Sequence, residues 1–225
     1  YKLTFLATAL FFFAFSLPAF LFIRERPATQ RRPSWPALLR IGLRNVAVSL
    51  REIRKHRTIA WFLLAFFLMN DALVTLFAFI SIYAHDTLGL SIGEIVPLFI
   101  LIQVLAFPCT LAAGWLFDRH GGKSFLLGAL GVWVLITSGL ALATSKPVFY
   151  VLGVLTAFVI GSSQAIARAW LSRLIPQEKR CEFFGFNGFA SKVAATIGPV
   201  VFGGISVLTG SQRLAMAGLL PFFVA

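Results

Sequence analysis

Charged residues are scarce in this chain of 225 residues: only 12% are Asp, Glu, Lys or Arg, and only eight residues are acidic. An ordinary soluble domain carries roughly twice that share of charge. Hydrophobic residues make up 59% of the chain, 25 residues are Phe, and the mean hydropathy is +0.88. A soluble fold of this size could not bury so many apolar side chains. The composition therefore excludes a soluble enzyme and a disordered tail, and it indicates a polytopic membrane protein.

Cysteine and histidine are also rare, with two and three residues. Cys109 and Cys181 lack the spacing of a disulfide framework or a metal site, which excludes a disulfide scaffold. His56, His85 and His120 fall in three different predicted loops, so we expect no metal cluster and no cofactor.

Motifs of catalysis are likewise missing. Gly122-Lys123-Ser124 ends like a phosphate-binding loop, but Phe117 stands where that motif needs glycine, and no predicted strand precedes it. No arrangement of Ser, His and Asp typical of a nucleophilic enzyme falls at membrane depth. We therefore expect a protein without enzymatic activity, driven by an ion or solute gradient rather than by nucleotide hydrolysis.

The formal net charge is +12, and most of it lies in one stretch. Residues 24–57 hold ten basic and two acidic residues. A basic loop between apolar segments is typical of positive charge retained in the cytoplasm, whereas nucleic-acid binding explains it poorly. We expect the lipid bilayer, and no nucleic acid, as a partner.

A helix needs about 20 apolar residues to cross the hydrocarbon layer. The chain has six such segments and the start of a seventh after Arg213, which predicts an all-α polytopic membrane protein with six complete transmembrane helices. Because the chain opens and stops inside apolar segments, we expect it to be a piece of a longer protein. The predicted spans are residues 3–23, 59–84, 93–116, 124–144, 148–171 and 183–208.

The predicted loops alternate in charge. Residues 24–58, 118–123 and 172–182 hold nearly all the loop Lys and Arg, so odd-numbered spans should end in the cytoplasm. Within the long loop, residues 26–36 contain three prolines and should be extended. Residues 37–56 repeat apolar side chains at helical spacing. This amphipathic helix either rests on anionic headgroups or packs against the bundle as a linker.

Polar side chains at membrane depth are unevenly distributed. The first and fourth spans have almost none and are expected to face lipid, whereas the other four carry amides or charges and are expected to line a water-accessible cavity. Polar walls of this kind are typical of secondary transporters. The candidate residues of the solute or ion pathway are Asn70, Asp71, Gln103, Gln164 and Lys192.

Asp71 is the strongest of these candidates. It lies about twelve residues into its span, or ~18 Å along the helix, close to the bilayer centre. A carboxylate at that depth takes a proton or finds a cation, and Lys192 could pair with it if their helices are neighbours. The alternatives are a structural hydrogen bond for Asp71 and snorkelling for Lys192. Gln103 and Gln164 either bind substrate or join helices.

Residues 114–123 read Gly-Trp-Leu-Phe-Asp-Arg-His-Gly-Gly-Lys. This stretch resembles the cytoplasmic loop motif of the major facilitator superfamily, G-x-x-x-D-R-x-G-R-[RK], with Gly122 in place of an arginine. The resemblance implies that the loop joins the second and third helices of a six-helix half and helps to lock the cytoplasmic gate. The gate residues that it implies are Gly114, Asp118, Arg119, Gly121 and Lys123, to which we add Arg168.

Further residues, given below, resemble the vacuole-effluxer-like branch of that superfamily, which includes autophagy-related vacuolar amino-acid exporters and bacterial relatives. Two positions depart from its pattern: Ala72 replaces a common glycine and Ala167 a serine. The residues that carry the resemblance are Asn70-Asp71, Gly161-Ser162-Ser163-Gln164-Ala165-Ile166-Ala167-Arg168, Pro176, Glu182-Phe183-Phe184-Gly185, Lys192 and Gly198-Pro199.

This resemblance implies a twelve-helix transporter of which the chain forms the C-terminal half. Residues 1–23 are then the last helix of the N-terminal half, residues 24–58 the basic cytoplasmic loop, and residues 59–225 the C-terminal half, cut in its last helix. The missing N-terminal half becomes a partner within the same protein. The second, third, fifth and sixth spans would border the central cavity, which matches the distribution of polar residues.

The function implied is secondary-active transport of a small solute, such as an amino acid, by alternating access, with or without a coupling proton. A proton-coupled drug or sugar carrier is one alternative, and a non-transporting receptor or scaffold is another. We expect an integral, multi-pass protein, in the plasma or inner membrane of a bacterium or in the vacuolar membrane of a fungus.

Overall fold

The computed structural model describes residues 2–22, 34–37, 40–42, 44, 48, 57–177 and 180–224. The elements found in this described part are helices, and none is a strand. The chain divides into two units, Tyr1–Leu43 and Arg44–Ala225. Most of the predicted amphipathic helix, residues 37–56, lies outside the described residues.

The first unit contains one long helix, α1 (Lys2–Phe22). It is apolar enough to cross a membrane, and none of its described side chains is buried within the chain. The helix matches the first predicted span within one residue at each end. Its exposed Leu and Phe side chains are those expected of a helix that contacts lipid or other protein segments.

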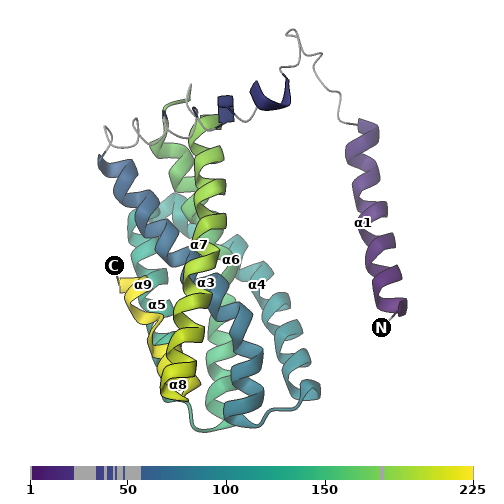
Figure 1. Cartoon of the computed structure of the whole chain (residues 1–225), viewed down its shortest axis with the longest axis vertical. Coiled ribbons are helices and arrows are strands. Elements are labelled where there is room, and N and C mark those ends of the chain that lie inside the picture. Colours follow the sequence, from purple (N-terminus) through teal and green to yellow (C-terminus); the bar gives the residue numbers. More distant parts are fainter. Residues whose placement is uncertain are drawn as a thin grey trace. The chain divides into compact units, whose positions relative to one another are not determined.

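The second unit is a bundle of antiparallel helices joined by short turns (Figure 1). Every predicted span falls on one of its helices or on α1, with ends that differ by up to four residues. The helices of this unit are α3 (Arg57–Leu88), α4 (Ile92–His120), α5 (Gly122–Leu142), α6 (Lys146–Leu174), α7 (Arg180–Thr209), α8 (Gln212–Ala217) and α9 (Leu220–Val224).

Five helices of the described part, α1 and α3 to α6, are long and apolar enough to cross a membrane. Helix α7 is one continuous helix of 30 residues, and its apolar described portion, Ala195–Thr209, is shorter than a full span. The short helices α8 and α9 follow where a seventh span was expected to begin. The count of six complete spans and the start of a seventh therefore stays a prediction.

Helix α6 is central to the bundle, because it packs against α3, α4 and α5. Helix α3 packs against α7, and α8 and α9 pack against α3 and α5, as Figure 1 shows for the C-terminal end of the chain. Polar and aromatic contacts reinforce this packing. The indole Nε1–H of Trp133 on α5 donates to Ser163 Oγ on α6 at 3.3 Å, and the Trp133 ring stacks on Phe223 of α9.

Helix α5, which the sequence placed against lipid, has two different faces. One face packs against α6, α8 and α9. In an 18-residue apolar stretch of α5, 33% of the residues are buried, whereas the corresponding share in α4 is 17%. The opposite face keeps Leu127, Leu135 and Leu142 exposed. Helix α5 is therefore a packed member of the bundle whose outer face has the apolar character of a lipid-facing surface.

Candidate functional site

The most unusual polar contact in the bundle joins α3 to α7. Asp71 is the fifteenth of the 32 residues of α3, about 21 Å from the start of a helix roughly 47 Å long. Its side chain is fully buried, with 0% exposed surface. Asp71 Oδ1 accepts a hydrogen bond from the backbone N–H of Gly198 on α7 at 3.0 Å. A carboxylate thus sits at mid-helix in a helix–helix contact.

The close approach of α7 to α3 depends on the absence of a side chain at Gly198. A Cβ atom there would lie 2.9 Å from Asp71 Oδ1 and would overlap Thr75 Oγ1. Thr75 lies one turn after Asp71 on the same face of α3, and its hydroxyl donates to the Asp71 carbonyl oxygen at 2.8 Å. Pro199 follows directly and has no N–H, so the backbone hydrogen bonds of α7 are interrupted beside this contact.

The second carboxylate oxygen of Asp71 is buried and has no hydrogen-bond partner among the described residues. A buried polar atom without a partner is costly, and a buried charge without one costs more. The carboxyl group at this position can therefore take up a proton or bind a cation, either of which would satisfy the free oxygen. The sequence predicted proton uptake or cation binding at Asp71, and that role stays a prediction.

The other predicted pathway residues differ in burial. Asn70 on α3 is 9% exposed and Gln164 on α6 is half-buried, on helices that contact each other. Gln103 on α4 and Lys192 on α7 are exposed in this chain. Helices α3 and α7 are neighbours, as a pair between Asp71 and Lys192 requires, yet no ion pair between those two side chains occurs in the described part of the chain. Asp71 bonds to the α7 backbone instead.

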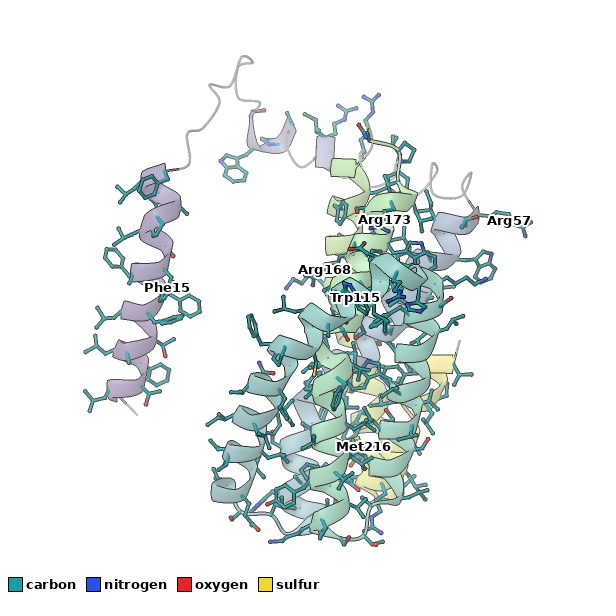
Figure 2. The ribbon with its side chains drawn as sticks, turned by 180° about the vertical axis from the view of Figure 1, so that it is seen from behind. Phe15, Arg57, Trp115, Arg168, Arg173 and Met216 are labelled. Atoms are coloured by element: carbon teal, nitrogen blue, oxygen red, sulfur yellow. The ribbon has the colours of Figure 1, made fainter. Side chains whose placement is uncertain are left out.

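The predicted gate motif forms the tight turn between α4 and α5. Gly121 has a φ of 83°, in the region that favours glycine, and its N–H donates to Phe117 O at 2.9 Å. Arg173 Nη2 in the last turn of α6 donates to Asp118 Oδ1 at 2.7 Å, and its guanidinium lies 4.3 Å from the centre of the Phe117 ring. Figure 2 labels Arg173 at this end of α6. The motif thus ties the α4–α5 turn to α6.

The remaining gate candidates are mostly exposed. Arg119 lies over the ring of Trp115, with its guanidinium carbon 5.3 Å from the ring centre, and Lys123 and Arg168 are exposed. Figure 2 labels Trp115 and Arg168 in the half of the bundle that carries the turn. Gly114 has no heavy atom within 4 Å of the place a Cβ would take. Among the described residues, no ion pair involves Arg119, Lys123 or Arg168.

The departure at Gly122 has a packing reason. A Cβ at this position would lie 2.7 Å from Trp170 Cγ and 2.9 Å from Phe117 Cε2. These aromatic rings occupy the space that the arginine of the superfamily motif would need. In this chain the turn is held instead by close contact between Gly122 and the two rings, and by the ion pair between Asp118 and Arg173.

Sequence reasoning missed several polar contacts between helices, and two of them involve residues that the sequence analysis had noted in another role. Arg173 was counted as a loop cation and not as the partner of Asp118, because nothing local links residues 55 positions apart. Ser163 was noted only as part of a motif, whereas its hydroxyl accepts from Trp133 and donates to its own helix at Val159 O. A serine beside a tryptophan-containing helix is the only signal that could have indicated this contact.

Comparison with known proteins places the chain in a family. The model of the family described as "Vacuole effluxer Atg22 like" matches residues 1–225. No solved structure shows significant similarity to the chain. The "Uncharacterized MFS-type transporter YxiO" of Bacillus subtilis is 26% identical over 99% of this chain and 51% of its own length.

Fungal relatives match the chain at similar sequence identity and also over only part of their own length. Autophagy-related protein 22-1 of Aspergillus niger is 24% identical over 98% of this chain and 40% of its own length. Autophagy-related protein 22 of Cryptococcus neoformans var. neoformans is 28% identical over 88% of the chain and 36% of its own length. The chain thus spans about half or less of these relatives. With its membrane-spanning helices and a match over its whole length, it is an integral membrane protein and belongs to the vacuole effluxer Atg22-like family.

Proposed function

We propose that the chain is part of a secondary-active transporter that moves a small solute by alternating access, with Asp71 as its membrane-embedded ionisable group. The observation that carries the proposal is the fully buried Asp71 carboxyl group at the α3–α7 contact, with one oxygen bonded to Gly198 and the other without a partner among the described residues. Burying an ionisable group at membrane depth costs free energy, so a residue such as Asp71 is a candidate for a functional role. Family membership supports the same reading, since one relative is named a transporter.

The contact offers a way to couple ionisation to movement. An ionised Asp71 is a stronger acceptor for the Gly198 N–H than a protonated one, because charge-assisted hydrogen bonds are the stronger kind. Protonation or cation binding at Asp71 therefore changes how firmly α7 is held against α3. Pro199 gives α7 a position at which its backbone can adjust. A proton or cation that binds one arrangement better than the other shifts the balance between the two.

The basic end of the bundle supplies the proposed gate. The Asp118–Arg173 pair joins α4 to α6, and both side chains are more than half exposed, at 68% and 57%. An exposed ion pair contributes little stability, so it can break and re-form as helices move. We place Gly114, Arg119, Gly121, Lys123 and Arg168 in the same gate, following the superfamily motif.

Asn70, Gln103, Gln164 and Lys192 form the polar wall of the pathway in this proposal. Amino acids are the solute class that the family resemblance implies. A drug or sugar carrier and a non-transporting scaffold remain the alternatives, and the test below separates them.

The proposal is tested with the full-length protein in proteoliposomes. Labelled amino acids, sugars and cationic drugs are screened for counterflow, and the transported solute is then used with Asp71→Asn and with Asp86→Asn as a matched control. Asp86 is a carboxylate outside the buried contact, bonded to Gln212 at 3.2 Å. We expect Asp71→Asn to insert normally and to lose transport or its ion coupling, while Asp86→Asn retains both. Wild-type coupling in Asp71→Asn would contradict the role of Asp71, and a scaffold would transport none of the solutes.

A further inference from the structure

A cavity of about 240 Å³ lies between α3, α5 and α6, in the half of the bundle that carries the α4–α5 turn. Its lining is apolar and aromatic, with Phe62 and Met69 on α3, Leu130 on α5 and Trp170 on α6. The rings of Phe62 and Trp170 meet edge to face, with their centres 4.9 Å apart. Helix α6 packs against both other helices, whereas α3 and α5 are not closely packed against each other. The cavity is therefore a space between α3 and α5 that no described helix fills.

Farther along the same two helices, α8 and α9 fill the space between α3 and α5. Both short helices contact α3 as well as α5. Phe223 of α9 is buried and stacks on Trp133 of α5, with the ring centres 5.9 Å apart. Trp133 lies about one helical turn from Leu130, which lines the cavity. The end of α9 is thus about one turn of α5 away from the cavity.

The path of α8 and α9 leads toward this cavity. Helix α8 begins just after the turn that ends α7, and Figure 1 marks the C-terminus at mid-height of the bundle. Gly218, between α8 and α9, has helical dihedral angles, φ −62° and ψ −13°, and its N–H donates to Leu214 O at 2.9 Å. The connection therefore carries the direction of α8 on into α9. An extension of α9 in that direction would enter the cavity.

The lengths of α8–α9 and of the cavity agree with such an extension. Residues 212–224 correspond to about 18 Å of helix, and the hydrocarbon layer is about 30 Å thick, so about eight further residues would complete a crossing. The cavity lining runs from Lys123 to Leu130 on α5 and from Thr58 to Met69 on α3, ~10 Å and ~16 Å of helix. About seven to eleven further helical residues would cover that length.

The far end of the cavity suits the C-terminal end of a helix. Lys123 and Thr58, in the first turns of α5 and α3, line the cavity there with an ammonium group and a hydroxyl. Among the described residues, no carboxylate lines the cavity and no ion pair involves Lys123. The last four carbonyl groups of a helix have no partner within the helix and carry partial negative charge. A helix that extends α9 would present these carbonyl groups to Lys123.

We propose that the segment that follows residue 225 in the full-length protein continues α9 as a helix and fills this cavity, with its C-terminal end beside Lys123. The apolar lining provides the contact surface, the path of α9 gives the direction, and the ammonium group of Lys123 favours a helix end. An acyl chain would also fit apolar walls, but it would not explain why the cavity lies in line with α9. The cavity is then a helix–helix contact and not a ligand site, whatever the protein transports.

The test is photo-cross-linking of the full-length protein in its membrane. The photoreactive residue p-benzoylphenylalanine replaces Ala65 or Leu127, which line the cavity from α3 and α5 and are exposed in this chain. In the matched control it replaces Leu135, which is exposed on the same helix as Leu127 and does not line the cavity. Mass spectrometry then identifies the peptide or lipid that is bound to each probe.

We expect the probes at positions 65 and 127 to join one and the same peptide, within about eleven residues after position 225. The probe at position 135 should join lipid or a different peptide. Lipid adducts at either cavity position, or adducts to any other segment, would overturn the proposal, because a helix in the cavity contacts both walls. Equal cross-linking of the segment after residue 225 to position 135 would also overturn it.

Discussion

The α3–α7 contact makes a sharp prediction for the substitution Gly198→Ala. The added methyl group would lie 2.9 Å from Asp71 Oδ1 and 3.1 Å from Asp71 Cγ, and it would overlap Thr75 Oγ1. Contacts this short force the backbones of α3 and α7 apart, because Thr75 and Asp71 are short side chains held in a fully buried contact. The Gly198 N–H would then move away from the carboxylate that it bonds to.

The expected cost follows from three terms. Overpacking of a buried contact costs about 1–3 kcal/mol. Weakening a hydrogen bond to a charged group costs up to about 1.5–3 kcal/mol. The better helix propensity of alanine returns about 1 kcal/mol. We therefore expect Gly198→Ala to destabilise the fold by about 1.5–5 kcal/mol. Thr75→Ala should relieve part of that loss when the two changes are combined, because it removes the nearest atom.

The assay is thermal unfolding of the full-length protein in detergent, with Gly204→Ala as the control. Gly204 lies on the same helix, and no heavy atom is within 4 Å of the place its Cβ would take. Gly204→Ala should leave the unfolding midpoint unchanged or raise it slightly, while Gly198→Ala lowers it by several degrees. Equal midpoints for the two variants would refute the packing argument and, with it, the close approach of Asp71 to α7.

Two further predictions concern the α4–α5 turn. Gly122→Ala should lower the temperature midpoint of unfolding, because its Cβ would lie 2.7 Å from Trp170 Cγ. The control Gly114→Ala should leave the midpoint unchanged, because no heavy atom lies within 4 Å of its Cβ position. Equal midpoints for the two variants would show that the turn tolerates a side chain at position 122. Arg173→Gln should cost less than about 1 kcal/mol of stability, because the pair with Asp118 is exposed, but it should change the transport rate of the full-length protein; an unchanged rate would remove the pair from the gate.

Much of the fold was predictable because a transmembrane helix is specified by the apolar residues of its own segment. Each apolar run long enough to cross the bilayer became a helix, and the ends shifted by no more than four residues since polar flanking residues continue a helix as readily as they end it. The helix carrying Pro199 also stayed continuous, because neighbouring helices and side chains can satisfy the backbone groups that a proline frees.

The partners of the polar residues were not predictable in the same way. The depth of Asp71 followed from its position in an apolar run, but its contact with Gly198 depends on which helices become neighbours and on the absence of a Cβ 127 positions away. The same holds for Asp118, whose partner Arg173 comes from another helix. Composition and spacing identify a polar group that is costly to bury in the membrane, whereas only the packed bundle shows what that group contacts.

The central claim is that amide and charged groups of α3, α4, α6 and α7 face a common water-filled pathway. The accessibility of single cysteines to a thiol reagent tests this claim most directly. In the full-length protein without Cys109 and Cys181, single cysteines replace Asn70, Gln103, Gln164 and, as the control, Leu135, which is 57% exposed on the apolar face of α5. A charged, membrane-impermeant thiol reagent should modify the three pathway positions, and transported solute should slow the reaction. Modification no faster than at Leu135 would contradict the claim, because those side chains would then face lipid or a sealed interior.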